Sequence, residues 1–223
     1  MGEWLRRTVF FSGHEWLVKG SDTEVGPGPN RFRDEARSVW VDDAGQLHLQ
    51  ISRVDGVWQC AEVVSRESFG YGEYVFHLCG GADEINENAV LGLFTWENEG
   101  AFNHREIDIE VSRWGDPGNA NGQYVIQPYG TPGNMHRFPM NLRGVGSSHR
   151  FEWRSDWVDF SSRSESGSML ARWRYTGPDV PPRGQEHARM NLWLFQRNPP
   201  SDGKEVEVVV RRFEFRPLAG TAP

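Results

Sequence analysis

Three acidic residues alternate with apolar ones in the run Glu106-Ile107-Asp108-Ile109-Glu110. Side chains alternate across a β-strand, so the three carboxylates would share one face and the isoleucines the other. No Lys or Arg interrupts the run, and like charges on one face disfavour strand pairing. A solvated acidic face is one interpretation. The interpretation we favour is a site whose chemistry requires carboxylates.

Paired carboxyl groups can cleave a glycosidic bond when one is ionised and the other is protonated. Crowding by like charge and partial burial raise the pKa of a carboxyl, which provides the protonated member. We therefore expect Glu106 and Glu110 to form the pair, with Asp108 between them sharing a proton with Glu106. Their Cα atoms would be ~13 Å apart on an ideal strand, whereas a retaining mechanism needs carboxyl groups ~5–5.5 Å apart. Both side chains must then lean inward, which a concave strand favours.

The segments around this run predict an all-β fold. Leu47, Leu49 and Ile51 alternate with polar residues in 46–53, which is typical of a half-buried strand. Clusters of Gly, Pro, Asn and Asp, such as 26–30 and 199–203, predict turns. This pattern indicates a sandwich or barrel, and a curved two-sheet sandwich would offer a concave face to an extended ligand. Similar strands are expected at 58–65, 72–79, 90–96, 105–112, 123–127, 149–154, 169–175, 190–195 and 206–215.

Composition restricts the function further. The chain has 223 residues without a repeat or low-complexity linker, which favours a single domain, 1–223. Ten Trp residues exceed what a core of this size needs, so some rings are expected to face a ligand. A net charge of −7 without a basic stripe argues against nucleic acid. The longest apolar run, Ala89–Phe94, is too short to span a membrane.

Cysteine and histidine give no metal pattern. Cys60 and Cys79 are too few for a disulfide framework or a structural zinc site, and a bond between them stays open. The histidines show no ligand spacing, so we expect no metal centre. The first residues lack the basic and apolar regions of a signal peptide, so either a leader was removed or the protein stays inside the cell.

Several segments resemble glycoside hydrolase family 16, the bacterial lichenases, laminarinases and their relatives. The Glu-Ile-Asp-Ile-Glu run resembles the family signature, in the form without an extra residue before the last Glu. Other segments are similar to lichenase segments and come in the same order over about residues 26–215: Cys60-Ala61-Glu62, Phe69-Gly70-Tyr71-Gly72-Glu73-Tyr74, Phe94-Thr95-Trp96 and Met190-Asn191-Leu192-Trp193.

The resemblance implies a β-jelly-roll sandwich of two curved antiparallel sheets with an open, concave substrate cleft. It implies that Glu106 is the nucleophile, Asp108 its partner and Glu110 the general acid/base. It further implies a monomer, secreted or periplasmic, that acts on a polysaccharide without a cofactor. The structural calcium common in the family is not supported, because Arg211 and Arg212 lie near the position of an expected Asp ligand.

Eight residues are candidates for substrate binding, and each also has an ordinary structural interpretation. The tryptophans could be sugar platforms or core. Glu62 could accept a sugar hydroxyl or make a structural hydrogen bond. His104 could be a subsite contact or a surface residue. The set is Asn30, Glu62, Phe94, Trp96, His104, Trp114, Gln123 and Trp193.

Two departures from lichenases leave the substrate open. His104 stands where lichenases have Trp, and the plant xyloglucan enzymes also have His there. Val64 stands where lichenases have Arg. The favoured interpretation is endo-hydrolysis of a β-glucan, β-1,3-1,4 or related. The alternatives are a transglycosylase, a galactan or xyloglucan hydrolase, and a carbohydrate-binding jelly roll without activity.

Overall fold

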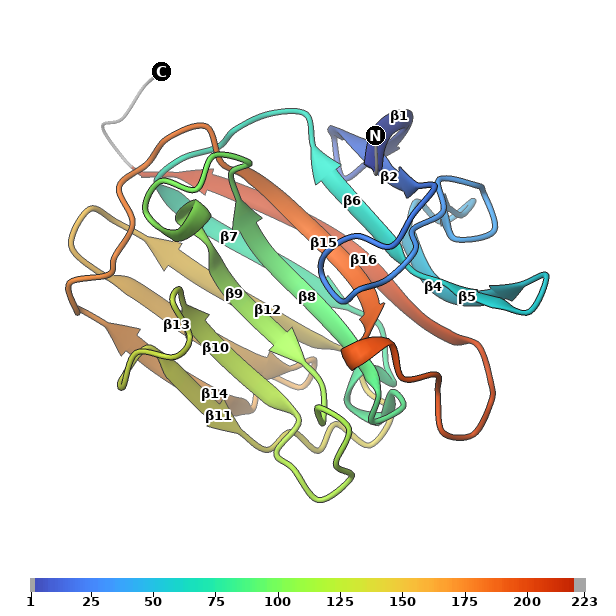
Figure 1. Cartoon of the computed structure of the whole chain (residues 1–223). Helices are drawn as coiled ribbons and strands as arrows, with labels where there is room; N and C mark the ends of the chain where they lie inside the picture. The colour runs from blue at the N-terminus through green and yellow to red at the C-terminus, as the bar shows by residue number, and fades with distance from the viewer. Residues whose placement is uncertain (1–2, 219–223) are drawn as a thin grey trace.

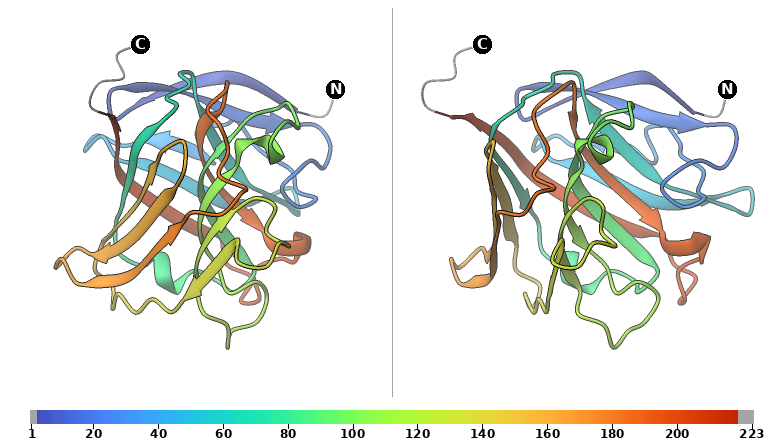
Figure 2. Two further views of the ribbon diagram at one scale, coloured as in Figure 1. Left: turned by 90° about the vertical axis from the view of Figure 1, so that its left-hand side faces the viewer. Right: turned by 60° about the vertical axis from the view of Figure 1, so that its left-hand side comes forward.

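The computed structural model describes residues 3–218 as two antiparallel β-sheets packed face to face (Figure 1). The right-hand view of Figure 2 shows the two layers side by side. In spatial order, the first sheet contains β1 (Glu3–Phe11), β2 (His14–Ser21), β6 (Ala61–Ser65), β15 (His187–Leu194), β8 (Ala89–Trp96), β9 (Ile107–Val111), β10 (Gly122–Ile126) and β11 (Met135–Phe138).

The second sheet covers the inner face of the first. Its strands in spatial order are β14 (Met169–Tyr175), β13 (Val158–Ser164), β12 (Ser147–Trp153), β7 (Gly72–Leu78), β16 (Val206–Pro217), β4 (Leu47–Val54) and β3 (Val39–Val41), and β5 (Val57–Gln59) pairs with β4. Helical structure in 3–218 is limited to the 3-10 turns η1 (Ala82–Glu84), η2 (Asn103–Arg105) and η3 (Phe195–Arg197). The all-β jelly-roll sandwich expected from the sequence is confirmed, and no helix in this part of the chain could cross a membrane.

The core lies between the sheets and is built from alternate residues of each strand. Leu47, Leu49 and Ile51 are fully buried, as their alternation with polar residues predicts. On β9, Ile107 and Ile109 face the same core. Burying apolar side chains contributes roughly 1.5–3 kcal/mol each, so strand parity at β9 is fixed by the core and not by the carboxylates.

Hydrogen-bond register places β9 in the middle of the first sheet. Asp108 lies opposite Phe94 of β8 and Val125 of β10, and Glu110 lies opposite Gly92 and Gln123. A one-residue slip would turn the isoleucines out of the core and the carboxyls into it. The register therefore presents the carboxyls on the outer face of the first sheet.

The prediction of a single strand over 58–65 is wrong, because the structure has two strands there. Its first part, β5, pairs with β4, and its second part, β6, belongs to the other sheet beside β15. The chain changes partners at Cys60, whose N–H donates to Arg31 O at 2.7 Å. Side chains keep alternating between the two faces when a strand changes its pairing partner. The alternation in the sequence therefore could not reveal the change.

Five strands were not expected. The polar strand β13, Val-Asp-Phe-Ser-Ser-Arg-Ser, lies between β12 and β14 and is held by tertiary pairing in spite of its serines. The others are the hairpin β1–β2 at one edge of the first sheet and the short strands β3 and β11 at sheet edges.

Candidate active site

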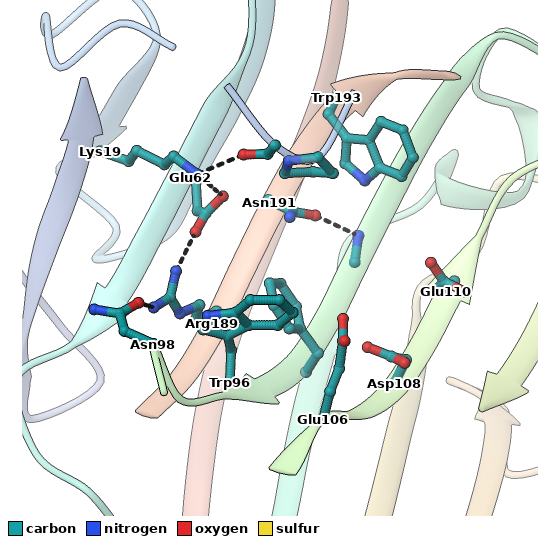
Figure 3. A pocket seen from close by; sticks show the side chains of 14 residues that line it. Lys19, Glu62, Trp96, Asn98, Glu106, Asp108, Glu110, Arg189, Asn191 and Trp193 are labelled. Atoms are coloured by element: carbon teal, nitrogen blue, oxygen red, sulfur yellow. Dashed lines mark hydrogen bonds and ion pairs between the residues drawn. The ribbon is translucent and has the colours of Figure 1, made fainter. Parts of the chain in front are cut away.

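The carboxyls of Glu106, Asp108 and Glu110 all line one cavity on the outer face of the first sheet. Figure 3 shows the carboxyl groups of Glu106 and Asp108 side by side, with Glu110 further along the strand. Asp108 is 4% exposed, and the other two are half-buried. The face assigned from sequence parity is therefore the face that lines the cavity.

Two glutamine amides from the neighbouring strand region contact this trio. Gln123 Nε2 donates to Glu110 Oε2 at 2.7 Å, and Gln127 Nε2 donates to Asp108 Oδ2 at 3.1 Å. The orientation of the Gln127 amide is fixed by a second hydrogen bond, because its Oε1 accepts the N–H of Tyr129 at 2.9 Å. Asp108 in turn is hydrogen-bonded to Glu106. Glu110 and Asp108 thus each have a neutral amide partner, and Glu106 is bonded to Asp108.

Burial raises the pKa of all three carboxyl groups. It raises the pKa of Glu106 to about 8, with the charge of Glu110 adding to the effect, and that of Glu110 to about 7. Burial, followed by the charge of Glu106, raises the pKa of Asp108 well above its ordinary value. Because the groups interact, their protons leave in steps shared by the trio. Near neutral pH the trio holds both ionised and protonated carboxyls, the combination that acid/base chemistry needs.

A strained turn immediately precedes Glu106. Four consecutive non-glycine residues, 102–105, have φ between 51° and 61°, a left-handed conformation that costs on the order of 1–2 kcal/mol per residue. Thr95 Oγ1 donates to Arg105 O at 2.8 Å, and Arg105 forms an ion pair with Glu97 and donates Nε to Pro182 O at 2.9 Å. These bonds offset the strain and fix the backbone that enters β9.

The cavity has a volume of about 330 Å³ and extends from the trio across β8, β15, β6 and β2. Glu62 lies at the end away from the trio and is 1% exposed. Its Oε1 accepts from Arg189 Nη1 at 2.9 Å, and its Oε2 lies 3.3 Å from Lys19 Nζ. Arg189 also donates to Asn98 Oδ1 at 3.1 Å. Figure 3 shows this charged cluster on the opposite side of the cavity from the trio.

Aromatic side chains and one glycine shape the rest of the cavity. Trp96 of β8 and Trp193 of β15 line it together with Phe94. Gly92 forms part of the floor, where an added Cβ would lie 2.5 Å from Asn191 Oδ1. The absence of a side chain at Gly92 therefore lets Asn191 approach the strand closely, and Asn191 Oδ1 accepts the N–H of Gly92 at 3.1 Å.

The candidate binding residues occupy two kinds of position. Glu62, Phe94, Trp96 and Trp193 line the cavity. The other four lie outside its lining: His104 stacks on Trp96 with ring centroids 3.9 Å apart, Trp114 meets Trp193 edge-on at 6.1 Å, Gln123 bonds Glu110, and Asn30 donates Nδ2 to Pro27 O and Leu194 O at 2.9 Å. Asn30 therefore holds the 26–30 loop, of which Gly26 and Pro27 reach the cavity.

Sequence reasoning did not select several residues that the structure brings to the site. Arg189 and Asn191 lie four and two residues before Trp193, so alternation alone places them on its face. Gly92 has the same relation to Phe94. Lys19 and Asn98 carried no signal, because nothing local to them indicates proximity to the trio.

Neither cysteine is bonded. Cys60 is buried, and burial raises the pKa of its thiol to about 12, while Cys79 donates to Gln46 Oε1 at 2.9 Å. Arg211 makes an ion pair with Glu165. Within 3–218, no cluster of three or more His, Cys, Asp or Glu side chains could hold a metal ion.

Comparison with known proteins shows what this fold resembles. No protein-family model matches the chain, and no curated protein matches it in sequence. Its fold is similar to a β-glucanase from Bacillus licheniformis, with 16% identity, a TM-score of 0.68, and 96% of this chain and 98% of that chain covered. A β-1,3-1,4-glucanase from a mouse hindgut metagenome gives 16% identity and a TM-score of 0.63, over 98% of this chain and 100% of that chain.

A third solved structure has the same fold. A β-1,3-glucanase from Mycobacterium marinum aligns with 15% identity and a TM-score of 0.67, over 89% of this chain and 90% of that chain. At these identities the likeness establishes a shared fold. The chemistry of this chain has to be argued from its own residues.

Proposed function

We propose that this chain is a retaining endo-glycosidase of the glycoside hydrolase family 16 type that cleaves a β-linked polysaccharide. The observation that carries the proposal is the trio of Glu106, Asp108 and Glu110 on one strand face, lining an aromatic cavity. Burial keeps acid forms in the trio at neutral pH. The fold shared with β-glucanases supports the same conclusion.

In the proposed first step, the carboxylate of Glu106 attacks the anomeric carbon while Glu110 gives its proton to the leaving oxygen. The glycosidic bond breaks and a glycosyl ester of Glu106 forms. Asp108 donates its O–H to Glu106 and so holds the nucleophile in place. In the second step, the Glu110 carboxylate takes a proton from water as the water attacks the ester, and the product keeps the β-configuration.

The cavity supports a neutral β-glucan as the substrate class. Trp96 and Trp193 offer ring faces for the apolar faces of sugars, and Glu62 and Asn191 offer groups for hydroxyls. Sugars on one side of the scissile bond would occupy this cavity, and those on the other side would cross β10 and β11. We further propose a secreted or periplasmic location, which gives access to such polymers.

The first test is a reducing-end assay on lichenan, laminarin, xyloglucan, carrageenan and agarose. We expect release of reducing ends from a β-glucan, and none from the Glu106→Gln variant. Tight binding without cleavage of any polymer would favour a carbohydrate-binding jelly roll. Mass spectrometry of the products separates hydrolysis from transglycosylation, because transfer to a sugar gives oligomers longer than the substrate.

The pH dependence of activity should reflect the raised pKa values of the carboxyl groups. A carboxyl with a raised pKa is protonated below that pKa and loses its proton as pH rises through it. Activity needs Glu106 ionised and Glu110 protonated, and burial raises the pKa of both groups, to about 8 and about 7. Because the trio shares its protons, kcat/KM should pass through a maximum near neutral pH: it rises as the trio loses the proton that leaves Glu106 ionised, and it falls as the next proton leaves Glu110. Initial rates measured from pH 5 to 9 check this, and a flat profile would contradict a protonated Glu110 as the acid.

A further inference from the structure

Three strands in register place Glu110, Gln123 and Arg137 in one row across the outer face of the first sheet. Gln123 is the register partner of Glu110 on β9 and of Arg137 on β11. The row is joined by two hydrogen bonds, from Gln123 Nε2 to Glu110 Oε2 at 2.7 Å and from Arg137 Nε to Gln123 Oε1 at 2.6 Å. Arg137 lies outside the cavity lining and was not a sequence candidate.

The chemistry of the row fixes the direction of both bonds. A guanidinium only donates hydrogen bonds, so the atom of Gln123 that faces Arg137 has to be the carbonyl oxygen. The amide NH₂ must then face Glu110. Gln123 is 4% exposed, so water does not compete freely for either end. Glu110 Oε2 therefore accepts a hydrogen bond, and the acid proton belongs on Oε1.

The opposite amide orientation would disable the acid. With Gln123 flipped, its carbonyl oxygen would face Glu110 and accept a hydrogen bond from the protonated carboxyl. The proton would then be bound to Gln123 instead of being available to the leaving oxygen. Without a donor behind Gln123, protonated Glu110 would favour this flipped state, because it pairs an O–H donor with a carbonyl acceptor.

The surroundings of Glu110 leave Arg137 as the cation that acts on it. Glu106 and Asp108 face it from its own strand, Gly92 of β8 has no side chain, and Gln123 is neutral. The charge of Arg137 lowers the pKa of Glu110, against the larger effect of burial. Arg137 is exposed and makes no ion pair within 3–218. Its guanidinium lies 6.0 Å from the Trp114 ring centroid.

We propose that Arg137 is a positioning residue that, by donating to Gln123, fixes the amide so that Glu110 keeps its proton for the leaving group. The inference rests on the proposed function and specifies how its acid is controlled. It assigns Arg137 a role in proton transfer without contact with the reacting atoms.

The test compares two leaving groups. Polysaccharide cleavage needs an acid to protonate the leaving sugar oxygen. In a 2,4-dinitrophenyl β-glycoside of the polysaccharide's disaccharide unit, the dinitrophenolate leaves without protonation. Full loss of an acid costs roughly 10²–10⁴-fold, so Arg137→Met should lose about tenfold or more in kcat/KM on the polysaccharide. It should lose little in formation of the glycosyl-enzyme from the aryl glycoside, measured by the burst of dinitrophenol. Its alkaline limb should move to higher pH, and Arg137→Lys should recover part of the activity.

The Gln123→Leu background is the matched control, because leucine cannot accept the proton. There, Arg137→Met should cause no further loss of kcat/KM at the pH of maximal activity, so that the two substitutions are coupled; a shift of the alkaline limb from the lost charge of Arg137 should remain. Thermal unfolding of each variant shows whether it is folded. Because Arg137 is exposed, its replacement should leave the protein folded. Equal losses on both substrates, or the same loss of kcat/KM from Arg137→Met in the Gln123→Leu background as in the parent, would overturn the proposal and indicate direct substrate binding.

Failure of this inference can be separated from failure of the proposed function. If Glu110→Gln shows the leaving-group dependence of a lost acid and Arg137→Met does not, the role of Arg137 is wrong and the mechanism stands. If the unaltered protein cleaves neither kind of substrate, the proposed function fails, and with it the inference.

Discussion

Replacing in turn each of the two glutamates proposed to be catalytic should give azide products of opposite configuration. In Glu106→Ala, azide enters the space of the missing nucleophile and attacks an activated β-glycoside directly. One inversion gives an α-glycosyl azide. In Glu110→Ala, the glycosyl ester on Glu106 still forms when the leaving group needs no proton. Azide then displaces Glu106 in a second inversion and gives a β-glycosyl azide. NMR of the anomeric proton distinguishes the two products.

Both variants should lose at least the 10²–10⁴-fold that an acid/base group contributes on unactivated polysaccharide. Exchanged anomers would mean that the nucleophile and the acid are assigned the wrong way round. Undiminished polysaccharide cleavage by both variants would place the catalytic strand elsewhere. Replacement of Glu67, an exposed glutamate near His14, by Ala is a suitable control that should show neither azide product nor loss of activity.

Local alternation was sufficient to predict the face of β9. The isoleucines occupy every second position, and burying them determines where the carboxyls point, so 106–110 could be interpreted without a structure. The same parity puts Phe94 and Trp96 on one face of β8. Strand periodicity thus gave the central part of the site directly.

Contacts between distant strands were beyond this reasoning. Glu62 meets Lys19 and Arg189, which are 43 and 127 positions away in the chain. Arg137 reaches Gln123 only because β10 and β11 pair in a particular register, which is set by the loop between them and by core packing. Periodicity says which face a side chain occupies and nothing about its neighbour on the next strand. The charged end of the cavity and the row to Arg137 could therefore not be predicted.

The middle carboxyl gives the second large expected effect. Asp108 Oδ2 accepts from Gln127, and its other oxygen is placed to donate a proton to Glu106. Burial raises the pKa of Asp108 well above its ordinary value, which favours the protonated form that can donate to Glu106. In Asp108→Asn the amide can mimic both bonds, with its oxygen accepting from Gln127 and its nitrogen donating to Glu106. The variant should therefore fold with an unchanged melting temperature.

Activity of Asp108→Asn should nevertheless fall by about 10²–10⁴-fold. In the proposed mechanism, Glu106 gains a bond to sugar and loses its charge in the first step, then regains the charge in the second. An O–H bond to a carboxylate is shorter and stronger than an amide N–H bond, and its proton can shift as the charge on Glu106 changes. Asparagine cannot release a proton, so it holds Glu106 with a weaker and unresponsive partner. Gln127→Leu removes only the bond on the far side of Asp108 and should cost less. Parent-level kcat/KM in Asp108→Asn, with the fold intact, would remove Asp108 from the mechanism and leave Glu106 to act without a proton partner.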